Sequence, residues 1–173
     1  NVQERIINYP EETKALAGTR YEVEDRLEEA ERIYEAAVSL RNMLEDKMDI
    51  RAQIIRNNTN LLQELNKVSA LNQSIMEREI FTSDDSRLTD ENIRKEKEAL
   101  KKAEDNISHI SDNLNEFNFT KEGVGIQEMV VEWLTACINE AKAKAEREVL
   151  KKRQQDIFDQ YSHMSPIGTQ VNR

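Results

Sequence analysis

Residues 23–48, VEDRLEEAERIYEAAVSLRNMLEDKM, decide the fold of this chain, because their apolar side chains recur with the spacing of a helix. The apolar positions alternate steps of four and three residues and are Val23, Leu27, Ala30, Tyr34, Ala37, Leu44 and Met48. A second row recurs at multiples of seven and contains Ile33, Leu40, Ile54, Leu61, Val68 and Ile75. Both rows predict one amphipathic helix from about Arg20 to Ile80, which would be ~90 Å long.

The polar tetrad NNTN at 57–60 leaves a second interpretation open. The apolar phase continues across it, which favours one helix. Asn60 with Gln63 can also form a weak helix cap, and two helices would then replace the single one.

Two further helices follow the stretch TSDDSRLTD at 82–90, which has turn-type residues and no apolar row. The first is expected over 90–117 and the second over 126–161, separated by a reversal near Gly123 and Gly125. Their rows at intervals of seven are Ile93, Leu100, Ile107 and Leu114, and then Met129, Ala136, Ala143, Leu150 and Ile157. We therefore expect an arm or short helix at 1–18, a helical body at 19–162 and a flexible tail at 163–173.

The composition excludes sheet-rich folds, because the 173 residues include only four Gly and two Pro. An average chain has roughly 12% of the two together, and they build most tight turns. Hydrophobic residues make up 38% and charged residues 34%, which suits thin helices rather than a thick core. The predicted fold is an all-α, elongated antiparallel helical bundle or coiled coil of three long helices, or four if the first breaks near Asn57 to Asn60.

The residues that usually carry chemistry do not form a recognisable site. His109 and His163 lack a glutamate three residues before them, the spacing that metal-binding bundles use. Cys137 lies on an apolar row, where a buried structural thiol is expected. The four glycines are scattered, so no phosphate-binding loop is present in the sequence. We expect no catalysis and no metal or other cofactor.

The formal net charge of −9 disfavours nucleic acid as a partner. The basic stretch 142–153 includes Lys142, Lys144, Lys151, Lys152 and Arg153, and it is expected to stabilise a helix C-terminus or to pair with the acidic stretch 22–35. No run of 18 apolar residues occurs, so no membrane span is expected.

The sequence leaves the compartment open. The single cysteine slightly favours the cytoplasm, while four N-x-[ST] sequons, at Asn57, Asn72, Asn106 and Asn118, would suit a secreted or surface protein. The start at Asn1 without Met suggests a piece of a longer protein.

Two classes of function fit these features. One is a structural or protein-interaction module, a scaffold or oligomerisation segment without chemistry of its own. The other is a ligand-recognition or receptor-recognition domain of a surface or secreted protein, with its binding surface at the 82–90 or 118–125 loop.

The lengths of the expected helices suggest where a partner would bind. The second and third helices would span ~42 Å and ~54 Å, too short to cover the first. Part of its apolar row would then face water, which usually marks an interaction site. The predicted partner-binding residues are Arg41, Leu44, Met48, Arg51, Ile55 and Asn58, and the simplest partner is a second, antiparallel copy.

Overall fold

The computed structural model describes residues 2–8, 20–81, 86–117, 119 and 124–164, and these residues are almost entirely helical, without a strand. The helices are α1 (Val2–Arg5), α3 (Arg20–Met48), α4 (Ile50–Asn58), α5 (Leu61–Phe81), α6 (Ser86–Asp112), the 3-10 turn η1 (Leu114–Phe117) and α7 (Val124–Met164). The all-α prediction is confirmed. Asn118, the fourth sequon asparagine, and the tail after Met164 lie outside the described residues.

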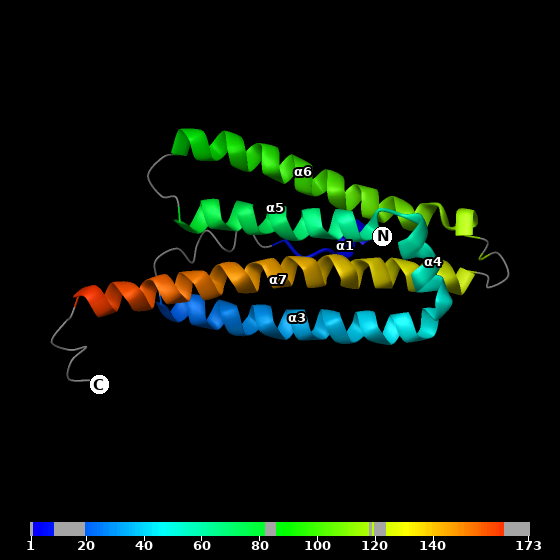
Figure 1. Ribbon diagram of the computed structural model, residues 1–173, viewed down its shortest axis with the longest axis horizontal. Coiled ribbons are helices and arrows are strands. Elements are labelled where there is room, and N and C mark those ends of the chain that lie inside the picture. Colours follow the sequence, from blue (N-terminus) through cyan, green and yellow to red (C-terminus); the bar gives the residue numbers. More distant parts are fainter. Residues whose placement is uncertain (1, 9–19, 82–85, 118, 120–123, 165–173) are drawn as a thin grey trace.

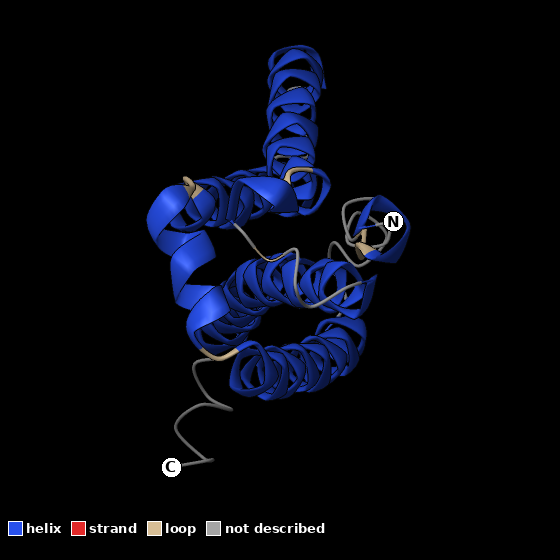
Figure 2. Cartoon of the chain, turned by 90° about the vertical axis from the view of Figure 1, so that its right-hand side faces the viewer, coloured by secondary structure: helices blue, strands red, loops and turns tan. Residues whose placement is uncertain are grey.

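Helix α7 lies at the centre of the molecule. It packs along α3 on one side and along α5 on the other, while α6 packs mainly on α5 (Figure 1). Seen along the helices, the four long ones do not surround a common axis, and α6 splays away from α5 toward its beginning (Figure 2). The shape is elongated, with α3, α7, α5 and α6 side by side.

The sequence of α7 explains its central place, because it has apolar residues on every side rather than in one stripe. Its buried side chains include Trp133, Leu134, Ile138, Ala143, Ala145, Val149 and Leu150, each at most 1% exposed. Such a helix is stable in water only when neighbours cover it from several directions.

The expectation of one helix from Arg20 to Ile80 is wrong, because the chain breaks twice in that range. The first break is Asp49, whose positive φ of 58° ends α3 and which the sequence did not predict. The second is at Thr59 and Asn60, close to the predicted alternative. Helix α4 crosses the end of the molecule between the two breaks, and α5 then runs back antiparallel to α3 (Figure 1).

Polar side chains at the second break bond back to the preceding turn of α4. Thr59 Oγ1 donates to the Ile55 carbonyl at 2.7 Å, and Asn58 Nδ2 donates to the Ile54 carbonyl at 2.8 Å. Such side-chain bonds compete with the main-chain bonds of a continuing helix. The NNTN tetrad therefore ends a helix, although the apolar phase continues through it.

The apolar rows identify most of the core despite these breaks, although Leu40 of the second row is 38% exposed. Val23, Leu27 and Ala30 pack against Leu150 and Ile157 of α7. The row expected in the second helix is also confirmed, since Leu100, Ile107 and Leu114 are 7%, 0% and 9% exposed. Helix α6 begins at Ser86, so the connection expected at 82–90 is shorter than its turn-type residues suggested.

We predict that Asp49→Gly stabilises the protein. A positive φ is costly for a residue with a side chain, and relieving it should gain about 1 kcal/mol of unfolding free energy. Urea denaturation followed by circular dichroism would measure the change. Ala36→Gly, at an exposed position inside α3, is the control and should instead lose about 1 kcal/mol. Destabilisation by Asp49→Gly would show that the break does not strain the backbone.

Candidate functional site

The apolar surface that the sequence assigned to a partner is largely inside the molecule. Leu44, Met48 and Ile55 are 3%, 0% and 0% exposed and belong to the main core. The expectation that they face water is wrong, because the breaks return α5 and α4 to the core instead of leaving a projecting helix. Asn58 is exposed, and Arg51 Nη1 donates to the Met48 carbonyl. A partner role for this stretch stays a prediction.

Arg41 belongs to a half-buried network of charges at the junction of α3, α4 and α7. Its guanidinium pairs with Glu140 of α7 and, at 3.2 Å, with Glu45 one turn further along α3. Glu45 also pairs with Arg56 of α4 and accepts a hydrogen bond from the Trp133 indole at 3.1 Å. The Arg56 guanidinium lies 5.4 Å from the centre of the Trp133 ring. One carboxylate thus joins three helices.

The surroundings of Glu45 favour its ionised form. Burial opposes ionisation, but the Trp133 hydrogen bond and the Arg56 and Arg41 guanidiniums outweigh it and lower the pKa of Glu45. Burial similarly opposes the charge of Arg41, and its carboxylate partners Glu140 and Glu45 nevertheless raise the pKa of Arg41. The network therefore stabilises the junction of α3, α4 and α7 when its side chains are charged.

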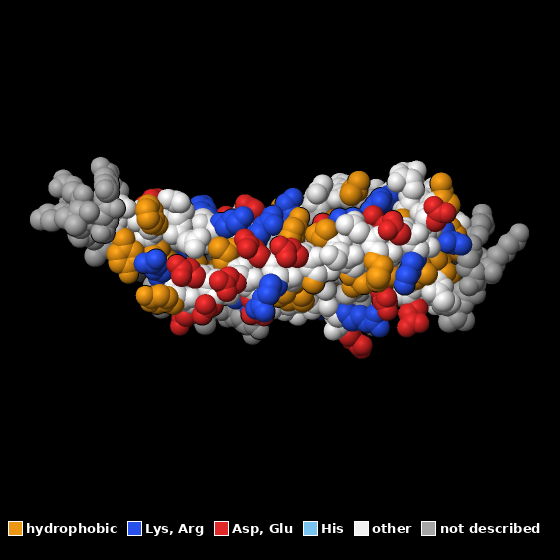
Figure 3. Space-filling model, turned by 90° about the horizontal axis from the view of Figure 1, so that it is seen from below, with side chains coloured by type: hydrophobic (Ala, Val, Ile, Leu, Met, Phe, Trp, Pro, Cys, Tyr) orange, Lys and Arg blue, Asp and Glu red, His pale blue; other side chains and the backbone are white. Residues whose placement is uncertain are grey.

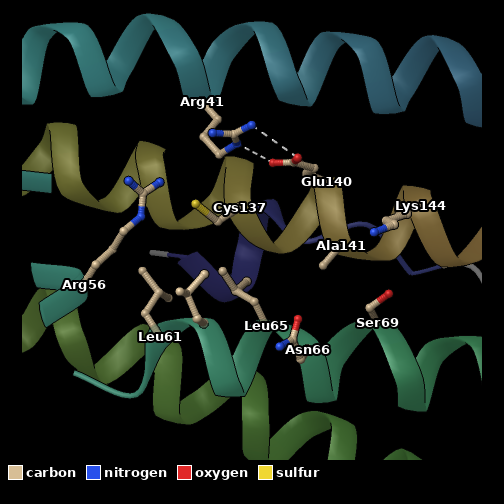
Figure 4. Close-up of a pocket in the computed structure, with 11 residues that line it drawn as sticks. Arg41, Arg56, Leu61, Leu65, Asn66, Ser69, Cys137, Glu140, Ala141 and Lys144 are labelled. Atoms are coloured by element: carbon tan, nitrogen blue, oxygen red, sulfur yellow. Dashed lines mark hydrogen bonds and ion pairs between the residues drawn. The ribbon is translucent and has the colours of Figure 1, made fainter. Parts of the chain in front are cut away.

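A pocket of about 240 Å³ lies beside this network, between α3 and α5 and over α7. Arg41 and Glu140 form one edge, and Leu61 and Leu65 form the opposite wall (Figure 4). The remaining lining residues are Arg56, Leu62, Asn66, Ser69, Cys137, Ala141 and Lys144. The pocket thus combines an ion-paired polar edge with a leucine wall, a lining that suits a small amphipathic group.

Cys137 contacts this pocket from α7 but is not prepared for chemistry. The thiol is free and only 4% exposed, and burial raises its pKa to about 12. A thiol at that pKa is almost entirely protonated near neutral pH, whereas the thiolate is the nucleophile. His109 lies elsewhere, exposed on α6 with Nδ1 3.5 Å from Asp112, and the side chain of His163 is outside the described residues.

The basic stretch 142–153 divides into groups with different roles. Lys142 is 1% exposed and pairs at 2.5 Å with Glu104 of α6, a carboxylate outside the acidic stretch 22–35. Lys151 lies 3.9 Å from Glu31, which is a contact with the acidic stretch 22–35 within one chain. Lys144 is exposed at the pocket rim.

Three exposed aromatic side chains, which we together call the aromatic patch, lie where α3 begins and α7 ends. The patch consists of Tyr21, Phe158 and Tyr161, which are 76%, 65% and 59% exposed. Val23 and Ile157 pack together beneath it, and hydrophobic side chains are visible at the surface of this end (Figure 3). The sequence argument missed the patch because it followed only the apolar rows, and Phe158 and Tyr161 lie outside those rows.

The described residues contain no cluster of His, Cys, Asp and Glu that could hold a metal ion. Among the same residues, no helix combines the length and apolar character needed to cross a membrane. Asn72, the second sequon asparagine, is fully buried, which leaves no room for a glycan in the folded chain.

Comparison with known proteins adds no family. The chain matches no protein-family model, and no similar curated protein or solved structure was found. Any function must therefore be inferred from the surfaces described above.

We predict that Glu45→Gln lowers the unfolding free energy by about 1 to 3 kcal/mol near neutral pH, because hydrogen bonds to a charged group are lost. The folded-state pKa of Glu45 lies below its ordinary value of 4.5, so the ionised group stabilises the fold above that pH and loses this effect as pH falls. The difference between wild type and variant should therefore shrink from about pH 5 to about pH 2.

Chemical denaturation at several pH values would measure this difference. Glu35→Gln, at an exposed carboxylate on the same helix, is the matched control and should leave stability unchanged. A Glu45→Gln deficit that stays constant across this pH range would contradict the assignment of the charged state.

We also predict that the Cys137 thiol reacts with a disulfide reagent orders of magnitude more slowly than a small-molecule thiol at mildly alkaline pH. Burial restricts access and suppresses the thiolate. Absorbance of the released thiolate would give the rate, and denaturant should restore full reactivity. Rapid labelling of the folded protein would mean that the pocket opens to expose Cys137.

Proposed function

We propose that this chain is a non-catalytic protein-interaction module, a scaffold or oligomerisation segment of a larger protein built as an elongated antiparallel helical bundle. The observation that carries the proposal is the aromatic patch of Tyr21, Phe158 and Tyr161. Trp133 is fully buried, which shows that this fold can bury large aromatic side chains. Three exposed aromatics at one end are typical of a binding surface.

The geometry of this end suits a protein partner. Val23, Leu27, Leu150 and Ile157 hold α3 against α7 and give the patch a rigid base. Aromatic side chains contribute large contact areas at a small cost in side-chain entropy, and they are enriched among the interface residues that contribute most of the binding energy. The simplest partner is a second copy of the chain.

The predicted surface at Arg41 to Asn58 is a competing contact for the same function. Its core residues are buried, but Met43 and Ile50 in this range are 46% and 66% exposed. The two surfaces lie at opposite ends of α3 and can be tested separately.

Recognition of a ligand or receptor by a surface or secreted protein is the alternative function, and the pocket beside Arg41 is the feature that supports it. However, the pocket volume of about 240 Å³ is below the range of roughly 300 to 1,000 Å³ that is usual for small-molecule sites. Arg41 and Arg56 are moreover already paired with Glu45 and Glu140. We therefore favour the protein-interaction module.

We predict that the chain self-associates at micromolar concentration and that Phe158→Glu returns its mass to that of the 20.2 kDa monomer. Burying a new carboxylate in an apolar contact is costly, whereas the exposed position leaves the fold intact. Sedimentation equilibrium measures the mass. Gln160→Glu is the matched control, since it adds the same charge two residues away at an exposed position on another side of α7 without removing an apolar side chain, and it should preserve the association.

The alternatives give different results in this experiment. Loss of association with Met43→Glu and Ile50→Glu, but not with Phe158→Glu, would assign the contact to the predicted surface. A monomer at every concentration would contradict self-association.

A further inference from the structure

Residues 2–8 lie against α6 and α7, on a surface that we call the groove, and side chains of both helices hydrogen-bond the segment. Asn139 of α7 makes two such bonds: its Nδ2 donates to the Arg5 carbonyl at 3.3 Å, and its Oδ1 accepts from the Ile7 amide at 3.1 Å. Arg5 is the last residue of α1, and Ile7 follows the helix in irregular backbone. The Asn139 amide therefore holds the main chain where it leaves α1.

Lys142 provides the second backbone contact. Its ammonium donates to the Ile7 carbonyl at 3.0 Å and lies 3.4 Å from Asn8 Oδ1. Glu104 of α6 pairs with the same ammonium at 2.5 Å, and both charged side chains are almost fully buried. A buried lysine is costly unless it is paired and hydrogen-bonded, and the segment supplies part of that compensation.

Three apolar side chains and one amide fix the register of the segment. Val2 and Ile6 are 1% and 8% exposed within the main core, and Ile7 packs near Met76 and Val149. The Gln3 amide donates to Asp105 at 3.0 Å and to Ser108 at 3.1 Å, both on α6. Hydrogen bonds to the main chain and apolar anchors therefore act together to hold the segment against α6 and α7.

We propose that this groove is a peptide-binding site that accepts residues 2–8 of a second copy of the chain as well as its own. The contacts at the groove are the same whichever copy supplies the segment, because the same sequence meets the same residues. The ratio between a segment docked in its own chain and a segment docked in a second copy then depends on the connection through residues 9–19 and on protein concentration. The same holds for other exchanges of a terminal element between identical chains. The site lies apart from the aromatic patch and goes beyond the function proposed above.

Cross-linking between two full-length variants tests the exchange. Gln3→Cys in one copy and Ser108→Cys in the other place thiols at residues that are in contact when the segment is docked. The copies are mixed, one of them labelled with a heavy isotope, treated with a short bis-maleimide and identified by intact mass. The native Cys137 is buried and contributes little background.

The matched control replaces Gln3→Cys with Glu4→Cys, because Glu4 is the exposed neighbour in the same segment. We expect several-fold more mixed dimer from the Gln3→Cys pair than from the control, and the yield should rise with protein concentration. Adding Asn139→Ala to the Ser108→Cys copy should reduce the mixed dimer to the control level.

A chain that carries both Gln3→Cys and Ser108→Cys makes a negative result decisive. If it cross-links within itself at every concentration while the mixed pair stays at the control level, the segment docks only in its own chain and the proposal fails. If neither cross-link forms, the segment does not dock in this groove and the proposal fails as well. Phe158→Glu should not alter the mixed dimer, so failure of the patch and failure of the groove are distinguishable.

Discussion

The need to cover α7 from several directions determines the arrangement of the other helices. Its buried side chains point toward α3, toward α5 and toward the N-terminal segment, and each fully buried Leu, Ile or Val contributes about 1.5 to 3 kcal/mol. A single antiparallel partner could bury only one of these faces. The chain therefore folds back at Asp49 and Asn60, which brings α5 to a face of α7 that a continuous first helix would have left exposed.

Charged networks lie at two points where three elements meet, one half-buried around Glu45 and one almost fully buried around Lys142. Glu45 joins α3, α4 and α7 through Arg41, Arg56 and Trp133. Lys142 joins α6, α7 and the N-terminal segment. Apolar contacts tolerate sliding of one helix along another. Sliding that separates a buried charge from its partner, however, costs about 3 to 5 kcal/mol. We infer that these two centres fix the helix register that apolar packing alone would leave loosely specified.

The sequence predicted the composition of the core better than the path of the chain. Periodicity identified Leu100, Ile107 and Leu114 as core residues because burial requires an apolar side chain in phase with its helix. The same phase crosses Asp49 and the NNTN tetrad because α4 and α5 also bury their rows against the core. Continuity of an apolar row therefore cannot distinguish a straight helix from a helix that breaks and returns. The positive φ of Asp49 depends on tertiary contacts, and no glycine marks it in the sequence.

The candidate sites were harder to predict for a related reason. Lys142 belongs to a basic stretch, and only the fold places Glu104 of α6 beside it. Asn139 is likewise an ordinary polar residue of a helix until residues 5 and 7 lie across it. Both residues recognise backbone atoms, so their partners leave no side-chain signature in the sequence. The groove holds Val2, Gln3, Ile6 and Ile7 by their side chains, and Arg5 and Asn8 each add one polar side-chain contact. Its specificity therefore arises from the spacing of these positions, while Asn139 and Lys142 hold the main chain that presents them.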